Sequence, residues 1–220
     1  MNSKNKTIKY CFDLDSTITK VETLPFLAEH FGVKQEMAAL CEELKAKNLD
    51  YAEDLKLRLN LLKPFPISEI QEIFTAIPLC SRILRFIREH KEECVVVTSN
   101  IDLYIKRLMS EVIGCNYYSS VGVEEGDKLR SIKSVISKEA VVKSLKGRLY
   151  KVVFIGDGRN DAEAIKAADW GIAASYVKKA ALEAAIVADM EVMTEEEAID
   201  AIMRFQSSHT KLNEHLSQKF

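Results

Sequence analysis

The stretch from Ile8 to Thr19, IKYCFDLDSTIT, joins a short apolar run to a polar end that carries two aspartates. The run from Ile8 to Leu14 has the length and composition of a buried β-strand. Asp13 and Asp15 stand where this strand gives way to a turn. Ligands of an open α/β sheet bind at the carboxyl ends of its strands, so both carboxylates are candidates for a binding crevice. Taken alone, the pattern fits an Asx turn or a helix N-cap equally well.

Further apolar runs repeat this pattern and alternate with helical periodicities. The other expected strands are Val95–Thr98, Val152–Ile155, Gly171–Ala174 and Met190–Met193. Apolar residues recur at helical spacing in Ser81–Lys91, Ile101–Ile113, Lys138–Lys146, Asp161–Ala168 and Thr194–Arg204. Continuous apolar strands that alternate with helices indicate a parallel sheet covered on both faces. We therefore expect an α/β fold with a doubly wound parallel sheet.

Two segments depart from this alternation. Residues 18–77 show only helical patterns, and prolines punctuate their later part, so we expect an inserted helical cap. Residues 1–17 and 78–220 would then form the α/β core. Residues 116–135 contain two strand-like runs around a polar turn, which predicts a small β-hairpin. The cap helices are expected at Leu24–Phe31, Lys34–Lys47, Ala52–Leu62 and Ile67–Phe74.

Polar residues also follow two later strands. The triplet Thr98-Ser99-Asn100 offers hydroxyl and backbone N–H groups at a helix start, which suits either a phosphate or an ordinary N-cap. The run GDGRND, residues 156–161, offers glycines for a tight turn and acidic groups that suit Mg²⁺. Lys138 opens the preceding helix and could place a point charge on a phosphate, or be a solvated surface lysine. All these residues fall at one predicted edge of the sheet, and this coincidence favours a single site.

Composition excludes several other classes of protein. The chain has 220 residues, 47% of them apolar, which is typical of a globular protein with a sizeable core. The formal net charge of −2, with Lys and Arg dispersed, predicts no nucleic-acid partner. No stretch predicts a membrane span or a signal peptide, so we expect a cytoplasmic protein. The five cysteines lack CxxC spacing and the four histidines lack metal-ligand spacing, which indicates neither a zinc site nor a disulfide framework.

Taken together, these motifs resemble those of the haloacid dehalogenase (HAD) superfamily, whose phosphatases use an aspartate nucleophile. The resemblance runs from about Ile8 to Ala174 and is strongest to the branch that contains phosphoserine phosphatase. It is carried by FDLDSTIT, by the threonine of VVVTSN, by the lysine of SKEAV and by FIGDGRND, in the family's order. It implies a Rossmann-like core with a cap, and a Mg²⁺-dependent phosphomonoester hydrolase that forms an aspartyl-phosphate.

The resemblance also implies roles for individual residues. Asp13 would attack phosphorus, and Asp15 would protonate the leaving oxygen and later activate water. The phosphoryl oxygens would be held by Thr98, Ser99, Lys138 and Asn160. The Mg²⁺ ligands would be Asp13, Asp157, Asp161 and, through its backbone carbonyl, Asp15. These residue types suit the reaction, since a carboxylate forms a labile acyl phosphate and its approach to an anionic ester needs screening by cations.

Four residues are expected to set the substrate. In phosphoserine phosphatases the positions of Glu22 and Arg58 bind the substrate's ammonium and carboxylate groups, although in this chain they could form a cap ion pair instead. Asn100 stands where that branch has glycine, and Arg159 adds a cation near the mouth of the site. The resemblance therefore makes phosphoserine, or a related amino-acid or amino-alcohol phosphate, the lead substrate. A sugar phosphate or a nucleotide-linked phosphate stays open, as do a monomer and a homodimer.

Four other functions are alternatives to a phosphatase. A phospho-acceptor signalling domain also phosphorylates an aspartate on a parallel sheet, but its acceptor is not on the first strand, and Asp15 would speed dephosphorylation. A phosphomutase would return the phosphoryl group to a sugar rather than to water. A binding module that kept the fold is disfavoured by the complete set of acidic residues. A P-loop kinase is disfavoured because GxxxxGK[ST] is absent.

Overall fold

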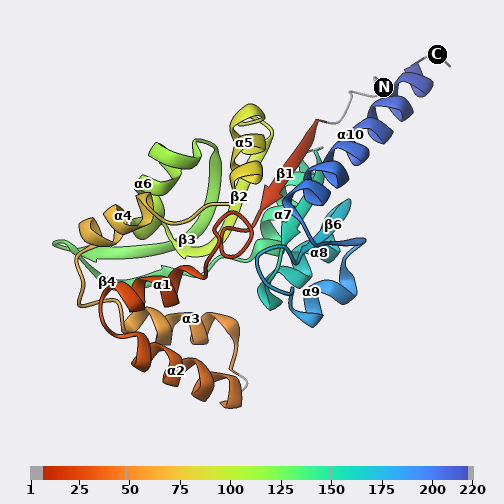
Figure 1. The fold of residues 1–220 in the computed structure, drawn as a ribbon. Helices are drawn as coiled ribbons and strands as arrows, with labels where there is room; N and C mark the ends of the chain where they lie inside the picture. The colour runs from red at the N-terminus through yellow and green to blue at the C-terminus, as the bar shows by residue number, and fades with distance from the viewer. Residues whose placement is uncertain (1–6, 48, 149, 218–220) are drawn as a thin grey trace.

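The computed structural model describes residues 7–47, 49–148 and 150–217, which surround one mixed sheet (Figure 1). Within these residues the sheet has seven strands, in the order β4-β3-β2-β1-β5-β6-β7. Neighbouring strands are parallel except for the antiparallel hairpin of β3 and β4. The strands are β1 (Ile8–Phe12), β2 (Cys94–Ile101), β3 (Asn116–Glu125), β4 (Lys128–Ser134), β5 (Lys151–Gly156), β6 (Trp170–Ala174) and β7 (Met190–Val192). The expected doubly wound α/β core and its β-hairpin are confirmed.

Alternate residues of β1 divide the hydrophobic core into two layers. Tyr10 and Phe12 pack into the layer on one face of the sheet, whereas Cys11 packs into the layer on the other. The first face is covered by α5 (Ser81–Glu89), α6 (Asp102–Arg107), η1 (Leu108–Ile113) and α10 (Glu195–Ser217). The second is covered by α7 (Lys138–Gly147), α8 (Ala162–Ala167) and α9 (Leu182–Val187). Side chains alternate along a strand, so a strand buried on both faces must be apolar throughout.

The segment between β1 and α5 is helical, and three of its helices lie together beyond the carboxyl end of β1 (Figure 1). These are α1 (Thr23–His30), α2 (Lys34–Lys47) and α3 (Tyr51–Asn60). The two ends of the segment lie side by side, because the N–H of Lys20 donates to the Pro78 carbonyl and that of Cys80 to the Ile18 carbonyl, each at 2.8 Å. The chain therefore leaves the core and returns to it at one place.

The last helix of this segment, α4 (Ile67–Thr75), packs against α6 on the core. Its start is bound to the turn between β3 and β4: the N–H of Ile67 donates to the Asp127 carbonyl at 2.9 Å, and that of Ser68 to the Asp127 carboxylate at 3.0 Å. A boundary of the cap at residue 77 stays a prediction, since α4 is in contact with the core along its length.

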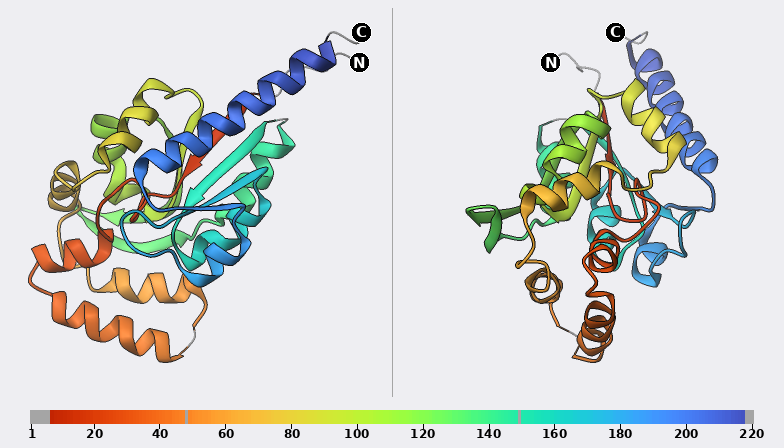
Figure 2. Two further views of the ribbon diagram at one scale, coloured as in Figure 1. Left: turned by 45° about the vertical axis from the view of Figure 1, so that its right-hand side comes forward. Right: turned by 60° about the vertical axis from the view of Figure 1, so that its left-hand side comes forward.

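Three elements differ from the sequence-based expectation. The helix expected over 101–113 is α6 followed by a π-helical turn, η1. Helix α10 continues to Ser217 instead of ending near Arg204, and it projects past the sheet on the side where β1 begins (Figure 2). Helix α9 was not expected, because an alanine-rich stretch of six residues carries too little periodicity to predict it. None of the helices among the described residues is long and apolar enough to cross a bilayer.

Candidate active site

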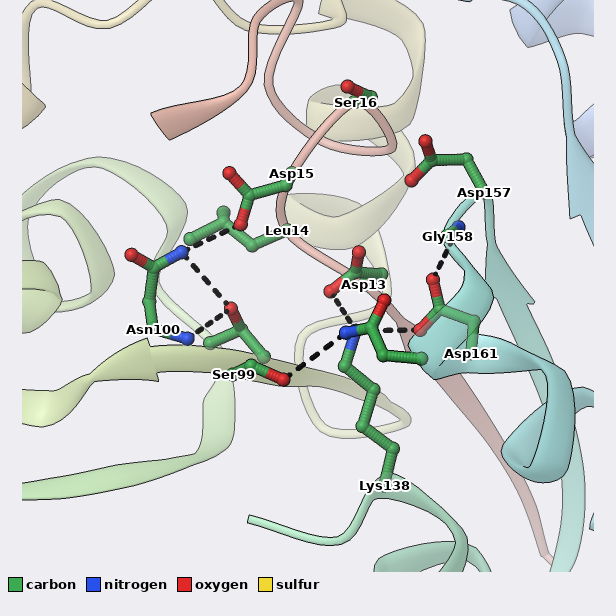
Figure 3. Close-up of polar contacts among 12 residues, drawn as sticks. Asp13, Leu14, Asp15, Ser16, Ser99, Asn100, Lys138, Asp157, Gly158 and Asp161 are labelled. Carbon is green, nitrogen blue, oxygen red and sulfur yellow. Dashed lines mark hydrogen bonds and ion pairs between the residues drawn. The ribbon is translucent and has the colours of Figure 1, made fainter. Parts of the chain in front are cut away.

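Four chain segments meet at the carboxyl ends of β1, β2 and β5 (Figure 3). Strand β1 pairs with both β2 and β5, so the residues that follow these strands become neighbours. Asp13 directly follows β1, and its N–H donates to the Ile155 carbonyl on β5 at 2.8 Å. Asp157 directly follows β5, and Lys138 reaches the same place from the start of α7. The predicted convergence of Asp13, Asp157 and Lys138 is thus present.

Lys138 bridges two buried carboxylates. Its Nζ lies 2.6 Å from Asp13 Oδ1 and 2.6 Å from Asp161 Oδ1. Burial raises the pKa of Asp13 well above its ordinary value, and the neighbouring Asp161 charge adds to this effect. Burial alone would lower the pKa of Lys138, but the charges of Asp13 and Asp161 outweigh it and raise that pKa above its usual range. The lysine therefore stays an ammonium ion.

Asp161 is placed by the glycines that precede it. The second oxygen of its carboxylate accepts a hydrogen bond from the N–H of Gly158 at 2.8 Å. A Cβ at position 156 would lie 2.5 Å from Asp161 Cγ, so only glycine leaves room for this side chain. The glycines of GDGRND thus allow the Asp161 carboxylate to accept a hydrogen bond from the backbone of its own loop.

The acidic cluster fits a hard divalent cation. Asp13, Asp157 and Asp161 are all buried, and each offers a carboxylate oxygen within 4.8 Å of the others. Asp157 Oδ2 is buried and accepts no hydrogen bond from any described residue, although Lys178 Nζ lies 3.2 Å away. Burial, followed by the Asp161 charge, raises the pKa of Asp157 to about 7. Carboxylate oxygens gathered in this way are hard donors of the kind that bind Mg²⁺.

Asp15 points away from this cluster, toward β2 (Figure 3). Ser16 adopts a left-handed backbone conformation, with φ at 53°, where the chain turns after Asp15. The N–H of Thr23 donates to Asp15 Oδ1 at 2.6 Å, and Asn100 Nδ2 donates to Asp15 Oδ2 at 2.7 Å. The Asp15 side chain does not join the group of potential metal ligands. Its contribution through the backbone carbonyl stays a prediction.

The expected phosphate-binding residues take different places. Ser99 and Asn160 line the cavity, and Asn160 Nδ2 donates to Ser99 Oγ at 3.2 Å. Thr98 is fully buried, and its hydroxyl accepts a hydrogen bond from the N–H of Asn100 at 3.1 Å. Thr98 is not among the residues that line the cavity. It supports the backbone next to the site, and a direct contact with phosphate stays a prediction.

A cavity of about 440 Å³ opens above the acidic cluster. This volume suits a small metabolite. Predicted site residues that line it are Asp13, Asp15, Glu22, Arg58, Ser99, Asn100, Lys138, Asp157, Arg159 and Asn160. The overhanging helices supply part of its wall, since Leu24, Tyr51 and Leu55 lie on α1 and α3.

The residues predicted to select the substrate already have partners inside the protein. Glu22 forms an ion pair with Lys178. Arg58 pairs with Asp54 on the same helix, and its Nε is buried without a hydrogen-bond partner among the described residues. Arg159 lies 3.5 Å from Glu183 with its side chain largely exposed, at the rim of the cavity. The open Nε of Arg58 leaves one donor for an incoming anion.

Lys178 and Tyr51 are among the cavity residues that sequence-based prediction missed. Lys178 lies on the loop after β6, and its position past another carboxyl end was the one signal available. Tyr51 opens α3 directly after the N-cap Asp50, and it lines the cavity together with Ser99. Burial raises the pKa of Tyr51, so it stays a neutral phenol. Nothing local in the sequence distinguishes Tyr51 from a packing residue of the cap.

The site thus combines a buried aspartate after the central strand, a bridging lysine, an acidic loop and a helical insertion. The family model for haloacid dehalogenase-like hydrolase matches residues 11–166, and the chain belongs to this family. This confirms the family expected from the motifs.

Two relatives show which members of the family the chain is similar to in sequence. The chain is 28% identical over 181 residues to the phosphoserine phosphatase of Archaeoglobus fulgidus, a match that covers 74% of this chain and 51% of that protein. It is 26% identical over 186 residues to the phosphoserine phosphatase of Methanocaldococcus jannaschii, which covers 79% of this chain and 87% of that protein. The chain thus spans about half the length of the first relative and most of the second.

Solved structures bear out the fold. A substrate-bound phosphoserine phosphatase superposes with a TM-score of 0.74 at 21% identity, over 90% of this chain and 99% of that one. A phospho-aspartyl intermediate analogue of phosphoserine phosphatase gives a TM-score of 0.72 at 21% identity, over 89% of this chain and 99% of that one. At this identity the likeness establishes the Rossmann-like core and leaves the substrate to be argued from the site.

Proposed function

We propose that the protein is a Mg²⁺-dependent phosphomonoester hydrolase that forms an aspartyl-phosphate on Asp13. The observation that carries this proposal is the meeting of Asp13, Lys138 and Asp157 at the floor of a cavity sized for a small metabolite. Membership of a hydrolase family and similarity to phosphoserine phosphatases point in the same direction.

In the first step, a carboxylate oxygen of Asp13 attacks phosphorus and the bond from phosphorus to the leaving oxygen breaks. Asp15 delivers a proton to that oxygen, so the leaving group departs as a neutral alcohol. Lys138 already contacts Asp13 Oδ1 and stands where it can neutralise the incoming phosphoryl oxygens. Because the carboxylate and the ester are both anionic, this fixed positive charge lowers the cost of bringing them together.

In the second step, Asp15 accepts a proton from a water molecule, which attacks the phosphorylated Asp13. The bond from phosphorus to the Asp13 oxygen breaks, inorganic phosphate leaves, and the carboxylate is restored. Dividing one difficult displacement into two easier ones is the gain from a covalent intermediate. Asp15 returns to its protonated state and is ready for the next ester.

The metal would be held by oxygens of Asp13, Asp157 and Asp161, whose crowding in a buried site the geometry supports. When bound, Mg²⁺ supplies positive charge that screens the phosphoryl group and the surrounding carboxylates. With Asp157 holding the metal, Lys178 would keep Glu22 as its acidic partner.

Phosphoserine, or a related amino-acid or amino-alcohol phosphate, is the lead substrate. Support comes from the named relatives and from Glu22 and Arg58, which both line the cavity. The ammonium group of a zwitterionic leaving group would replace Lys178 as the partner of Glu22. Its carboxylate would replace Asp54 as the partner of Arg58. A sugar phosphate or a nucleotide-linked phosphate would need no ammonium contact and remains the alternative.

We place the enzyme in the cytoplasm, with a freely diffusing ester as substrate and helices of segment 18–77 as its cap. The five cysteines are all free thiols, which fits a reducing compartment. A monomer and a homodimer are equally compatible with the described surface.

The test is phosphate release from a panel of esters by the purified full chain with Mg²⁺. The panel contains phosphoserine, phosphoethanolamine, a sugar phosphate, a nucleotide and p-nitrophenyl phosphate, and Asp13→Asn is the control. We expect catalytic release that stops in the variant, together with an acid-stable phosphoenzyme in the parent after rapid quenching. A phosphoenzyme that lasts for hours would indicate a signalling domain, and isomerised sugar phosphate without free phosphate would indicate a mutase. Release that survives in Asp13→Asn would refute the proposal.

A further inference from the structure

Both oxygens of the Asp15 carboxylate are held by donors from different parts of the molecule, and Figure 3 shows the donor from Asn100. Oδ1 accepts from the backbone N–H of Thr23, at the start of α1, at 2.6 Å. Oδ2 accepts from Asn100 Nδ2, on β2, at 2.7 Å. One donor therefore belongs to the helical segment and the other to the sheet, so the direction of Asp15 depends on both.

Asn100 is itself fixed in place. Its side chain is buried, and its backbone N–H donates to Thr98 Oγ1 at 3.1 Å. Its side-chain amide also meets the buried hydroxyl of Thr23, with Asn100 Nδ2 and Thr23 Oγ1 3.0 Å apart. A buried amide with several partners has one orientation, which it imposes on the carboxylate it contacts.

We propose that Asn100 is a positioning residue that aims the Asp15 carboxylate at the leaving-group oxygen, with the Thr23 hydroxyl as its brace. This inference rests on the phosphatase function proposed above. Asp15 accepts hydrogen bonds from Thr23 and Asn100. Lys138 contacts Asp13 and Asp161 instead, so it does not orient Asp15. Without Asn100, one oxygen of Asp15 loses its donor, and only the Thr23 N–H opposes rotation of the carboxylate.

The consequence concerns the leaving group. Proton delivery from Asp15 matters most when the leaving oxygen is a strongly basic alkoxide, and least when it departs readily as p-nitrophenolate. A small error in the position of a catalytic group costs about 10²-fold in rate. Loss of Asn100 should therefore slow the cleavage of alkyl phosphates selectively and leave the binding of the ester nearly unchanged.

The experiment compares Asn100→Ala, Thr23→Val and Thr23→Ser with the parent full chain. Single-turnover phosphorylation of Asp13 is followed by rapid quenching, with an alkyl phosphate from the active panel and with p-nitrophenyl phosphate. We expect Asn100→Ala to lower the phosphorylation rate about 10–100-fold for the alkyl ester and less than threefold for the nitrophenyl ester. Thr23→Val keeps the backbone donor but loses the brace, so it should show the same selectivity at smaller size, and Thr23→Ser should restore parental rates.

If Asn100→Ala slows both esters by the same factor, or slows neither, the ratio of the two rates is unchanged. That result would overturn the inference and give Asn100 a merely structural role. If Asn100→Ala does not fold, as judged by its thermal transition, Thr23→Val decides the question alone. Failure of the phosphatase proposal looks different, because the parent chain would then form no phosphoenzyme with either ester, or would form one without releasing inorganic phosphate.

Discussion

Lys138 Nζ lies 2.6 Å from Asp13 Oδ1, although 125 positions separate the two residues in the chain. The same ammonium also bridges Asp161, so one lysine compensates two buried carboxylates. Taking charges out of water is costly unless each has a partner, and the cost of an unpaired buried charge exceeds the gain from most single contacts. This contact therefore supports the fold of the site as well as its chemistry.

Replacement of Lys138 should destabilise the metal-free protein. Lys138→Met leaves Asp13 and Asp161 buried without their cation, and breaking such a pair costs about 3–5 kcal/mol. Urea unfolding in a chelator measures the change. Lys143→Met, an exposed lysine of the same helix that pairs with Glu139, is the matched control and should change stability by about 0.5 kcal/mol or less. Equal effects of the two substitutions would contradict the prediction.

Asp157→Asn should stabilise the protein in the absence of metal. Burial and the Asp161 charge raise the pKa of Asp157 to about 7 in the folded state, against about 3.9 for an ordinary aspartate. An acid with a raised folded pKa loses stability as the pH rises from its unfolded value to its folded value, and the loss is complete above that. In a chelator at pH 8, the variant should therefore unfold roughly 2–4 °C or more above the parent, and near pH 4 the difference should vanish.

The same pair of proteins tests the metal. Mg²⁺ should raise the unfolding temperature of the parent, because it binds the folded state alone, and should have little effect on Asp157→Asn. Asp200→Asn on the exposed face of α10 is the control and should keep the full response. An undiminished Mg²⁺ response in Asp157→Asn would exclude this carboxylate as a ligand.

Arg58→Ala should raise KM for phosphoserine about tenfold or more, because it removes the planar donor for the substrate carboxylate. The value of kcat should change less, since Arg58 lies on α3 and its ion pair is with Asp54 on the same helix. KM for p-nitrophenyl phosphate, which has no carboxylate, is the internal control. A similar rise for both esters would indicate that Arg58 serves the architecture of the cap.

Lys178→Gln should favour substrates that carry an amine. Lys178 is paired with Glu22, so its removal frees this carboxylate for the ammonium group of an incoming ester. We expect the ratio of KM for phosphoserine to KM for an amine-free ester to fall several-fold. An unchanged ratio would show that Glu22 does not meet the ammonium group. Glu22→Gln, which removes the charge from the other side, should raise the same ratio.

Much of the fold was predictable because its signals are local. A strand that is buried on both faces must be apolar throughout, which is why β1, β2 and β5 stand out in the sequence. Parallel strands then bring their carboxyl ends to one edge, so the sequence predicts that Asp13 and Asp157 lie close together. The glycine before Asp157 was informative for a related reason, since a side chain at Gly156 would collide with Asp161.

Other features depend on tertiary contacts that leave no local trace. Helix α9 and the extension of α10 beyond Arg204 carry weak periodicity, and packing against neighbours decides whether such segments are helical. Asn100 looks like an N-cap in the sequence, whereas in the structure its amide contacts Asp15. The Lys178 partner of Glu22 lies on a loop after β6, far along the chain, and no spacing rule connects them.

The sequence by itself determined the candidate site: an alternation of apolar strands and helices predicted the sheet, whose strand ends and helix starts bring Asp13, Asp157 and Lys138 to one edge. The tertiary structure alone decided the partner of each charged group in that site. Lys138 pairs with Asp13 and Asp161, Lys178 pairs with Glu22, and Asn100 donates a hydrogen bond to Asp15. The reason is physical, since periodicity reports whether a side chain is buried, whereas the partner of a buried charge depends on which distant segments the folded chain brings within a few ångströms.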